Sequence, residues 1–255
     1  MAKPETKAVG DLLDLSGEQI LVTGASGNIG QGIAARLAEA GATVIAHYHQ
    51  NAAAAAALID RLGAGRVIGA DLTNKASVDA MLDSAAATMV VNNAAVQTVQ
   101  NLSDMSFSDW RLMMAANLDS AFLVTQRAAQ AWSAADRGGA VVNIASIEGL
   151  DPALGHGHYA TSKAGLVMLT RAAALEFGAA RIRVNTVSPG LIDREGLHKD
   201  WPDGVARWRD RVPLGRIGTP NDVADAVLFL LSPAARWISG ANLIVDGGMS
   251  TQGKW

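Results

Sequence analysis

The sequence predicts an α/β fold, a doubly wound parallel sheet of seven strands with helices on both faces. Short apolar runs rich in β-formers alternate with longer helical patterns along the whole chain, which is typical of a parallel sheet covered on both sides. A glycine-rich turn, Thr23–Gly30, lies directly between the first predicted strand and the first predicted helix. No linker-like change in composition and no repeat divides the 255 residues, so a single domain over 1–255 is expected.

The elements follow from the two periodicities. The predicted strands are Ile20–Thr23, Thr43–Tyr48, Val67–Ile68, Met89–Val91, Val141–Ile144, Val184–Val187 and Leu243–Val245. The predicted helices are Gly30–Glu39, Ala52–Leu62, Lys75–Ala86, Ser106–Ala134, Tyr159–Phe177 and Asn221–Leu231. The segment 191–212 is predicted as an insertion before the last strand. Its two tryptophans, Trp201 and Trp208, are interpreted either as an apolar lid or as packing onto the body or onto a neighbouring subunit.

Composition excludes several classes of function. Hydrophobic residues make up 49% of the chain, which is too many for a disordered protein. A net charge of −3 gives no reason to expect nucleic acid or an anionic membrane as partner. The absence of cysteine excludes disulfides and thiolate chemistry, and we expect no metal site. The polar first ten residues and the lack of a long apolar run predict a cytoplasmic protein.

The glycine-rich turn predicts a phosphate site. Glycines allow the backbone to turn tightly and to approach a pyrophosphate, and the following helix offers free N–H groups at its start. A glycine-rich stretch by itself is often only a tight turn. Its position after the first strand of an alternating β/α chain favours dinucleotide binding.

Tyr159 and Lys163 form a candidate acid/base pair. A spacing of four residues places them on one face of a helix. A neighbouring ammonium favours the phenolate and is expected to lower the tyrosine pKa towards neutrality, where the hydroxyl can exchange a proton with a carbonyl or alcohol oxygen. The same spacing is also common on solvated helix faces.

Further motifs resemble the short-chain dehydrogenase/reductase family, which has a Rossmann fold. The turn Thr23–Gly30 is similar to its cofactor signature, although Asn28 stands where the middle glycine is expected. Asn is one of the few residues that tolerate positive φ. The other matching segments, in chain order, are Asp71–Thr73, Asn92–Ala95 (with Ala95 in place of glycine), Asn117, Ser146, Ser188–Gly190, Arg216–Ala224 and Val245–Gly248. The stretch between Asp71 and Asn92 is shorter than in the family.

The resemblance implies four catalytic residues. Tyr159 would exchange the proton, Lys163 would lower its pKa and hold the nicotinamide ribose, and Ser146 would bond the substrate oxygen. Asn117 would hold a water in a proton relay behind Lys163. The residues that the resemblance places at an NAD(P) cofactor are Gly24, Ser26, Asn28, Ile29, Gly30, Tyr48, His49, Asp71, Leu72, Asn93, Ala94, Tyr159, Lys163, Pro189, Gly190 and Ile192.

The end of the second strand favours NADP over NAD. A carboxylate there would bond the ribose 2′-hydroxyl and repel a 2′-phosphate. The local sequence, Ala46–Asn51, contains neither a carboxylate nor a lysine or arginine, and Tyr48 aligns roughly with the usual aspartate. His49 and Asn51 are expected near the phosphate.

The substrate is predicted less sharply. Ser146, Glu148, His156 and Tyr159 are expected to line its pocket, with His158 beside them and Arg194 and His198 nearby on the insertion. These polar groups suggest a polyol, a sugar-derived compound or a keto or hydroxy acid, but they also fit exposed loop residues. The family often carries threonine where Arg194 falls, so that contact with the nicotinamide is in doubt. The resemblance also implies a homotetramer or dimer.

Other functions are weighed against a dehydrogenase. One is a catalytically silent dinucleotide-binding sensor, and another is a scaffold that keeps the four residues without using them. The complete set of Asn117, Ser146, Tyr159 and Lys163 argues against the sensor. An epimerase or dehydratase of the extended relatives would need a larger C-terminal substrate domain. A reductase of an apolar ketone or of a 3-oxoacyl-type substrate is the remaining alternative.

Overall fold

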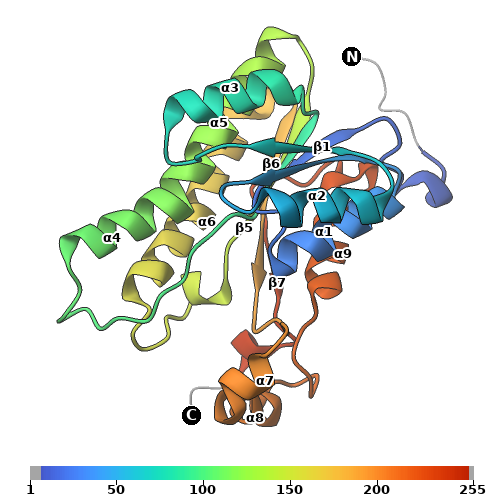
Figure 1. Cartoon of the computed structure of the whole chain (residues 1–255). Coiled ribbons are helices and arrows are strands. Elements are labelled where there is room, and N and C mark those ends of the chain that lie inside the picture. The colour runs from blue at the N-terminus through green and yellow to red at the C-terminus, as the bar shows by residue number, and fades with distance from the viewer. Residues whose placement is uncertain (1–6, 253–255) are drawn as a thin grey trace.

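The computed structural model describes residues 7–252, and its seven strands form one parallel sheet (Figure 1). The order of the strands is β3-β2-β1-β4-β5-β6-β7, with every neighbouring pair parallel. Their bounds are β1 Gln19–Val22, β2 Thr43–Tyr48, β3 Arg66–Gly69, β4 Met89–Asn92, β5 Gly139–Ile144, β6 Ile182–Pro189 and β7 Asn242–Val245. The predicted doubly wound seven-stranded sheet is confirmed.

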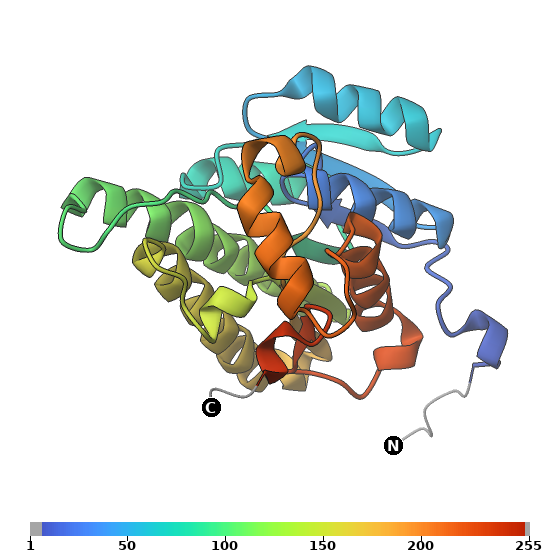
Figure 2. The ribbon, with the colours of Figure 1, turned by 90° about the horizontal axis from the view of Figure 1, so that it is seen from below.

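Helices cover both faces of the sheet (Figures 1 and 2). One face carries α1 Asn28–Glu39, α2 Ala52–Leu62 and α9 Pro220–Leu231. The other carries α3 Lys75–Ala85, α5 Ser120–Ala134 and α6 Gly157–Phe177. Successive strand residues supply the two cores in turn: Ile20 and Val22 belong to the first and Leu21 to the second. Strands buried on both faces explain why their sequences read as continuous apolar runs.

The shortened stretch before β4 still forms a packed helix. The Asn74 side chain caps α3 by accepting from the Ser77 N–H, and the helix buries Val78, Met81 and Leu82 against the second core. Ala86 then ends the helix in a left-handed conformation with φ of 47°, and β4 begins three residues later. The sequence predicted this helix with nearly the same bounds.

The predicted helix Ser106–Ala134 is wrong as a single helix. The chain forms α4 Phe107–Met114, then a π-helical turn over Ala115–Asp119, and only then α5. A π-turn inserts an extra residue into the helix and reorients the side chains within it, often at functional sites. Apolar periodicity does not reveal such an insertion, because the helical pattern resumes on the other side.

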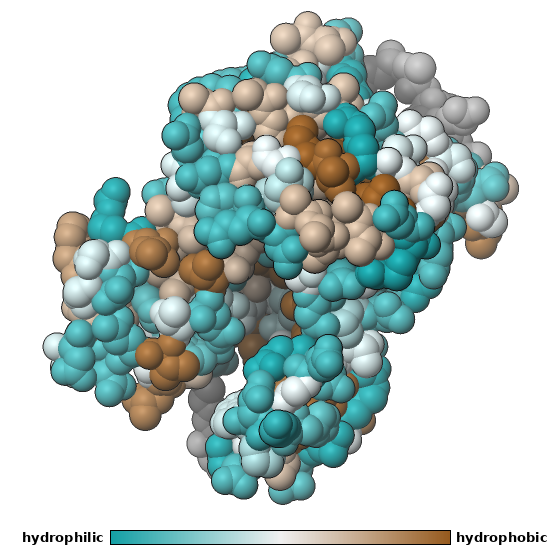
Figure 3. Space-filling model, viewed as in Figure 1, coloured by the Kyte–Doolittle hydropathy of each residue, from teal (hydrophilic) through white to brown (hydrophobic). Residues whose placement is uncertain are grey.

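The insertion 191–212 contains two short helices, α7 Leu197–Asp200 and α8 Pro202–Arg211. They lie beyond the ends of β5, β6 and β7, and Figure 3 shows a recess between this segment and the rest of the molecule. Trp208 packs with Leu197, Val205 and Ile217. Trp201 is half-exposed and lies on Gly204, where a Cβ would meet its ring. Trp208 thus packs inward, against its own segment and against Ile217 outside it, whereas Trp201 faces outward.

No helix within residues 7–252 is both long enough and apolar enough to cross a membrane.

Candidate active site

The predicted site residues gather at the carboxyl ends of the central strands. The glycine turn follows β1, Asn93 and Ala94 follow β4, Ser146 follows β5, and Pro189 closes β6. In an open parallel sheet this edge is where ligands bind, since the strand order reverses there and leaves a crevice. The topology therefore brings together segments that lie far apart in the sequence.

The glycine turn leaves no room for side chains at two positions. Gly24 has φ of +60°, and a Cβ there would lie 2.9 Å from the Ala94 Cα. A Cβ on Gly30 would lie 2.4 Å from the Gly24 carbonyl oxygen. Asn93 fixes the turn by donating from Nδ2 to the carbonyl oxygens of Thr23 and Gly24, at 2.9 and 3.1 Å. A bare backbone at the start of α1 fits a pyrophosphate.

His47 supports this turn, and sequence reasoning did not find it. Its Nδ1 accepts a hydrogen bond from the Gly24 N–H at 3.1 Å, so the proton sits on Nε2, which donates to the Ala70 carbonyl oxygen at 3.1 Å. Burial lowers the pKa of His47, and the ring is neutral. The only signal in the sequence is a histidine at an inward position of a buried strand.

Asn28 links the turn to the insertion. Its Nδ2 donates to the Asp193 carbonyl oxygen at 2.7 Å. Asn28 is the first residue of α1 and does not have a positive φ. The sequence suggested that Asn stands here because it tolerates positive φ, but the structure does not use that property. Asn28, which stands in place of the expected glycine, instead joins the glycine turn on one side of the crevice to the insertion on the other side.

Tyr159 lies in the first turn of α6 and Lys163 one turn later. The Lys163 Nζ lies 5.6 Å from the centre of the Tyr159 ring and donates to the Ile144 carbonyl oxygen at 2.8 Å. Lys163 is only 2% exposed, and burial lowers its pKa to about 8. The two residues share one face of the helix, as their spacing predicts.

The expected lowering of the tyrosine pKa is wrong for this structure. Burial raises the pKa of Tyr159 to about 12, a hydrogen bond from Ser146 opposes this shift, and the charge of Glu148 adds to it. The Lys163 ammonium is directed at a carbonyl oxygen and does not contact the phenol oxygen, so it does not offset the burial. The Ser146 Oγ also accepts from the Glu148 N–H at 3.1 Å.

Asn117 lies in the π-turn and is 1% exposed. Its Oδ1 accepts from the Val96 N–H at 2.8 Å, and its Nδ2 donates to the Val96 carbonyl oxygen at 2.9 Å. Nδ2 also lies 3.2 Å from the Ser162 Oγ. Asn117 therefore joins the loop after β4 to α6 beside Lys163.

Glu148 and His156 form a hydrogen-bonded pair next to Tyr159. The His156 Nδ1 lies 2.7 Å from the Glu148 Oε2, and the His156 ring stands edge-on to the Tyr159 ring at a centroid distance of 6.2 Å. The loop after β4 borders them, because the Gln97 Nε2 lies 3.4 Å from the His156 Nδ1. On the same loop, Thr98 bonds the buried His158 at 2.8 Å.

The predicted adenosine contacts also lie at this edge. Tyr48 ends β2 with its ring against Gly69, and His49 is exposed. Asp71 accepts from the N–H and the hydroxyl of Thr73, which lowers its pKa, and the side chain of Leu72 is buried. From α2, Arg61 donates to Gln31, whose amide donates to the Ser26 carbonyl oxygen. That guanidinium was not found from the sequence.

On the opposite side of the crevice, Gly190 lies against the insertion. A Cβ on Gly190 would lie 2.9 Å from both Trp208 and Asp246. Ile192 pairs with Gly218 in an isolated bridge. Arg194 is ion-paired with Asp200 at 2.8 Å, and His198 lies 3.6 Å from Asp193. Arg194 and His198 are thus engaged within the insertion and do not contact Tyr159.

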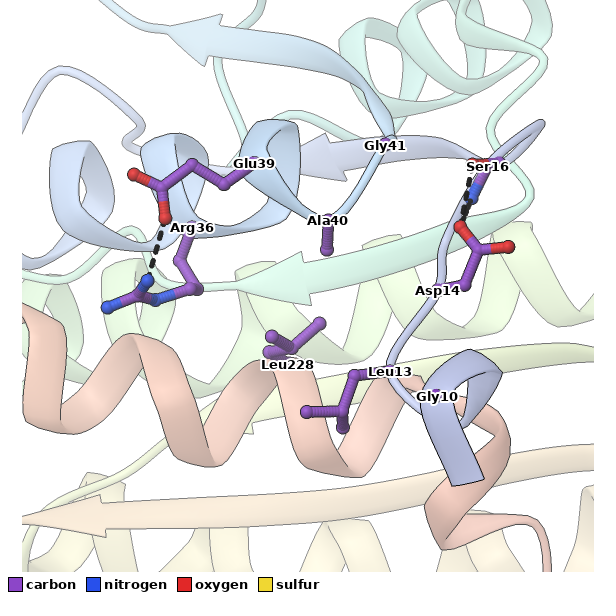
Figure 4. Close-up of a pocket in the computed structure, with 9 residues that line it drawn as sticks. All are labelled: Gly10, Leu13, Asp14, Ser16, Arg36, Glu39, Ala40, Gly41 and Leu228. Carbon is purple, nitrogen blue, oxygen red and sulfur yellow. Dashed lines mark hydrogen bonds and ion pairs between the residues drawn. The ribbon is translucent and has the colours of Figure 1, made fainter. Parts of the chain in front are cut away.

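A separate surface depression lies at the other edge of the sheet, near the amino ends of β1 and β2 (Figure 4). Arg36 is its cation, but Glu39 and Asp225 both pair with it, at 2.7 and 2.6 Å. Ser16 is likewise bonded to Asp14. Its polar groups are satisfied among themselves, and it contains none of the predicted site residues. Within the described residues, no group of three or more acidic or histidine side chains is arranged to hold a metal ion.

Comparison with known proteins shows the family to which the chain belongs. A family model described as enoyl-(acyl carrier protein) reductase matches residues 24–250. D-threitol dehydrogenase from Mycolicibacterium smegmatis is 38% identical over 245 residues, which cover 92% of this chain and 93% of that protein. Human (3R)-3-hydroxyacyl-CoA dehydrogenase is 37% identical, covering 90% of this chain and 94% of that protein.

Solved structures show the same fold. A short-chain type dehydrogenase/reductase from Mycobacterium marinum superposes with a TM-score of 0.90 at 35% identity, covering 96% of this chain and all of that one. A protein from Agrobacterium tumefaciens assigned as a 2-deoxy-D-gluconate 3-dehydrogenase, with bound NADP, gives 0.89 at 32% identity and covers 95% of this chain. The chain therefore belongs to the short-chain dehydrogenase/reductase family, whose members are NAD(P)-dependent oxidoreductases acting on CH–OH groups.

Proposed function

We propose that this chain interconverts a polar secondary alcohol and its ketone, with Tyr159 as the acid/base. The observation that carries the proposal is the meeting of Tyr159, Ser146 and Lys163 at the sheet edge next to the glycine turn. A bound nicotinamide would supply or accept the hydride, and this chain's own residues place the reacting groups and move the proton.

Each catalytic residue has a role that its contacts support. In reduction, Tyr159 donates a proton to the substrate oxygen and Ser146 donates a hydrogen bond to the same atom, which stabilises the developing charge. The tyrosine pKa of about 12 has to fall for the reverse reaction. An ammonium turned from the Ile144 carbonyl towards the phenol would favour the phenolate, so Lys163 is positioned to lower that pKa when the site is filled.

Asn117 is proposed as a positioning residue. Its bonds to Val96 and Ser162 hold the loop after β4 against α6, next to Lys163. The water relay that the family resemblance implies stays a prediction.

We favour NADP over NAD as the cofactor. The end of β2 carries Tyr48 and His49 and no carboxylate to repel a 2′-phosphate. Arg61 is connected to the glycine turn through Gln31 by two successive hydrogen bonds, and it adds a positive charge on that side. The NADP bound to the Agrobacterium protein supports this preference.

The substrate is proposed to be polar. Glu148 and His156 form a polar, hydrogen-bonding wall beside Tyr159, which favours a polyol, a sugar-derived compound or a keto or hydroxy acid over an apolar ketone. The threitol dehydrogenase supports a polyol, while the hydroxyacyl-CoA dehydrogenase keeps a 3-oxoacyl-type substrate as the alternative.

A homotetramer or dimer and a cytoplasmic location stay predictions. Large apolar side chains are exposed on α4 and α6, where relatives are expected to associate (Figure 3). They are Phe107, Leu112, Met168 and Leu175.

The test is a screen of the purified protein with NADP and NAD against secondary alcohols, polyols, sugar acids and 3-hydroxyacyl thioesters, followed by the absorbance of reduced nicotinamide. We expect turnover with at least one polar alcohol and tighter binding of NADP. An equal or tighter affinity for NAD contradicts the cofactor preference. Binding without turnover on the whole panel supports the silent sensor instead.

A further inference from the structure

We infer that the Glu148–His156 pair selects neutral, multiply hydroxylated substrates and rejects anionic ones, so that within the polar substrates proposed above the chain oxidises polyols in preference to hydroxy acids. This inference rests on the proposed dehydrogenase function. It makes Glu148 a specificity-determining residue.

The pair occupies a fixed place beside the reacting group. Ser146 lies two residues before Glu148 and also bonds Tyr159, and His156 directly precedes α6 and stacks edge-on to the tyrosine ring. The Glu148 carboxylate is close enough to act on the ionisation of Tyr159. When the reacting oxygen of a substrate lies against Tyr159 and Ser146, the groups next to that oxygen therefore lie close to Glu148 and His156.

The pair presents hydrogen-bond acceptors. The Glu148 Oε2 is 2.7 Å from the His156 Nδ1, and because a carboxylate has no proton to give, Nδ1 donates this hydrogen bond. The other carboxylate oxygen, Oε1, accepts no hydrogen bond from the described residues. Substrate hydroxyls next to the reacting carbon supply the matching donors, whereas an ionised carboxylate has no donor to offer.

No lysine or arginine among the described residues pairs with the Glu148 carboxylate. Arg194, on the insertion, is paired with Asp200, and the Lys163 ammonium is buried behind the tyrosine and bound to the Ile144 carbonyl oxygen. An anionic substrate would therefore meet a like charge at Glu148 without a free cation in contact with the pair, and like charges brought together in an interface are strongly disfavoured.

The experiment compares kcat/KM for a four-carbon polyol and for the four-carbon polyhydroxy acid of matching stereochemistry. For the unmodified chain we expect a preference for the polyol of at least about tenfold. In Glu148→Gln, which keeps the shape and loses the charge, this ratio is expected to fall at least about tenfold, mainly through a lower KM for the acid. Glu176→Gln, an exposed carboxylate at the far end of α6, is the matched control and leaves the ratio unchanged.

Three outcomes overturn the inference: a preference of the unmodified chain for the acid, a higher kcat/KM for a 3-hydroxyacyl thioester, or a ratio that Glu148→Gln does not change. If the protein still turns over other alcohols in any of these three cases, the proposed dehydrogenase function is not contradicted. No turnover of any alcohol with either nicotinamide overturns both. If Glu148→Gln does not fold by circular dichroism, Glu148→Ser removes the same charge in a smaller side chain and replaces it.

Discussion

At the scale of single residues, the reacting tyrosine is held in an environment that opposes its ionisation. Burial and the charge of Glu148 raise the pKa of Tyr159, and only the hydrogen bond from Ser146 lowers it. The protonated phenol is thus the form that the site holds, ready to donate. Donation suits reduction of a ketone directly, while oxidation needs Lys163 to move its charge towards the phenol oxygen.

Tyr159→Phe is expected to lower kcat by about 10²- to 10⁴-fold, because it removes the hydroxyl that is proposed to transfer the proton to the substrate oxygen. The fold should persist, since the ring and its edge-on contact with His156 remain. Stopped-flow and steady-state assays measure the loss, and a cofactor titration of the same variant is the control, with unchanged affinity expected. Retained kcat would contradict the assignment of Tyr159.

A second residue-scale prediction concerns Asn28. Removing its side chain breaks the bond to the Asp193 carbonyl oxygen, and a single hydrogen bond contributes about 0.5–1.5 kcal/mol. Asn28→Gly, which restores the residue usual in the family, should therefore weaken cofactor binding about two- to tenfold. It should also speed hydrogen exchange of residues 191–195.

Asn28→Ala separates this bond from backbone entropy, because alanine lacks the donor but keeps a Cβ. Calorimetric titration with NADP should give the same loss for both variants. A loss in Asn28→Gly alone would mean that the flexible backbone of glycine, and not the missing bond, is the cause.

At the scale of elements, the helices that carry the site are fastened to the sheet by buried polar side chains. Asn92, on β4, donates to the Asn143 Oδ1 on β5 at 2.8 Å, and the Asn143 Nδ2 donates to the Thr170 Oγ1 on α6 at 2.8 Å. The Thr186 Oγ1 on β6 lies 2.7 Å from the same Thr170 oxygen. Directional bonds of this kind fix how α6, and with it Tyr159, sits over the sheet.

Asn143→Ala is expected to destabilise the protein by about 2–4 kcal/mol, because it leaves buried amide and hydroxyl groups unpaired and opens a small cavity. Urea unfolding followed by circular dichroism measures the change. The exposed Asn101→Ala serves as the control and should stay within about 0.5 kcal/mol of the unmodified chain. Equal stability of the two variants would show that the network contributes little.

The elements were predictable where a local pattern determines them. All seven strands and their order along the chain followed from apolar runs between turn signals. The shared helix face of Tyr159 and Lys163 followed from their spacing, whereas their proposed roles rest on the family resemblance. The π-turn around Asn117 was not predictable, since one extra residue leaves the helical pattern intact. The pairing of Glu148 with His156 depends on how two loops meet in space, and the role of His47 depends on a backbone N–H from another segment.

At the scale of the whole molecule, the site reduces the stability of the fold. Lys163 is an ammonium that is almost fully buried, and its recorded partner is a carbonyl oxygen rather than a carboxylate. Its pKa, lowered from 10.5 to about 8, corresponds to a cost of about 3 kcal/mol for holding the charge inside.

Lys163→Met is therefore expected to abolish turnover and to raise the free energy of unfolding at pH 7 by about 1–3 kcal/mol, the lower value allowing for the lost bond to Ile144.

Between pH 8 and 10.5 the unfolded chain binds the lysine proton and the folded chain does not, so the stability of the unmodified protein rises with pH in that window. The advantage of the variant should shrink over the same range. The raised pKa of Tyr159 acts above pH 10 in both proteins and cancels from the difference. Urea unfolding at pH 7, 9 and 10.5 measures the three values, and a variant less stable than the unmodified chain at pH 7 would show that the buried ammonium is better compensated than its contacts indicate.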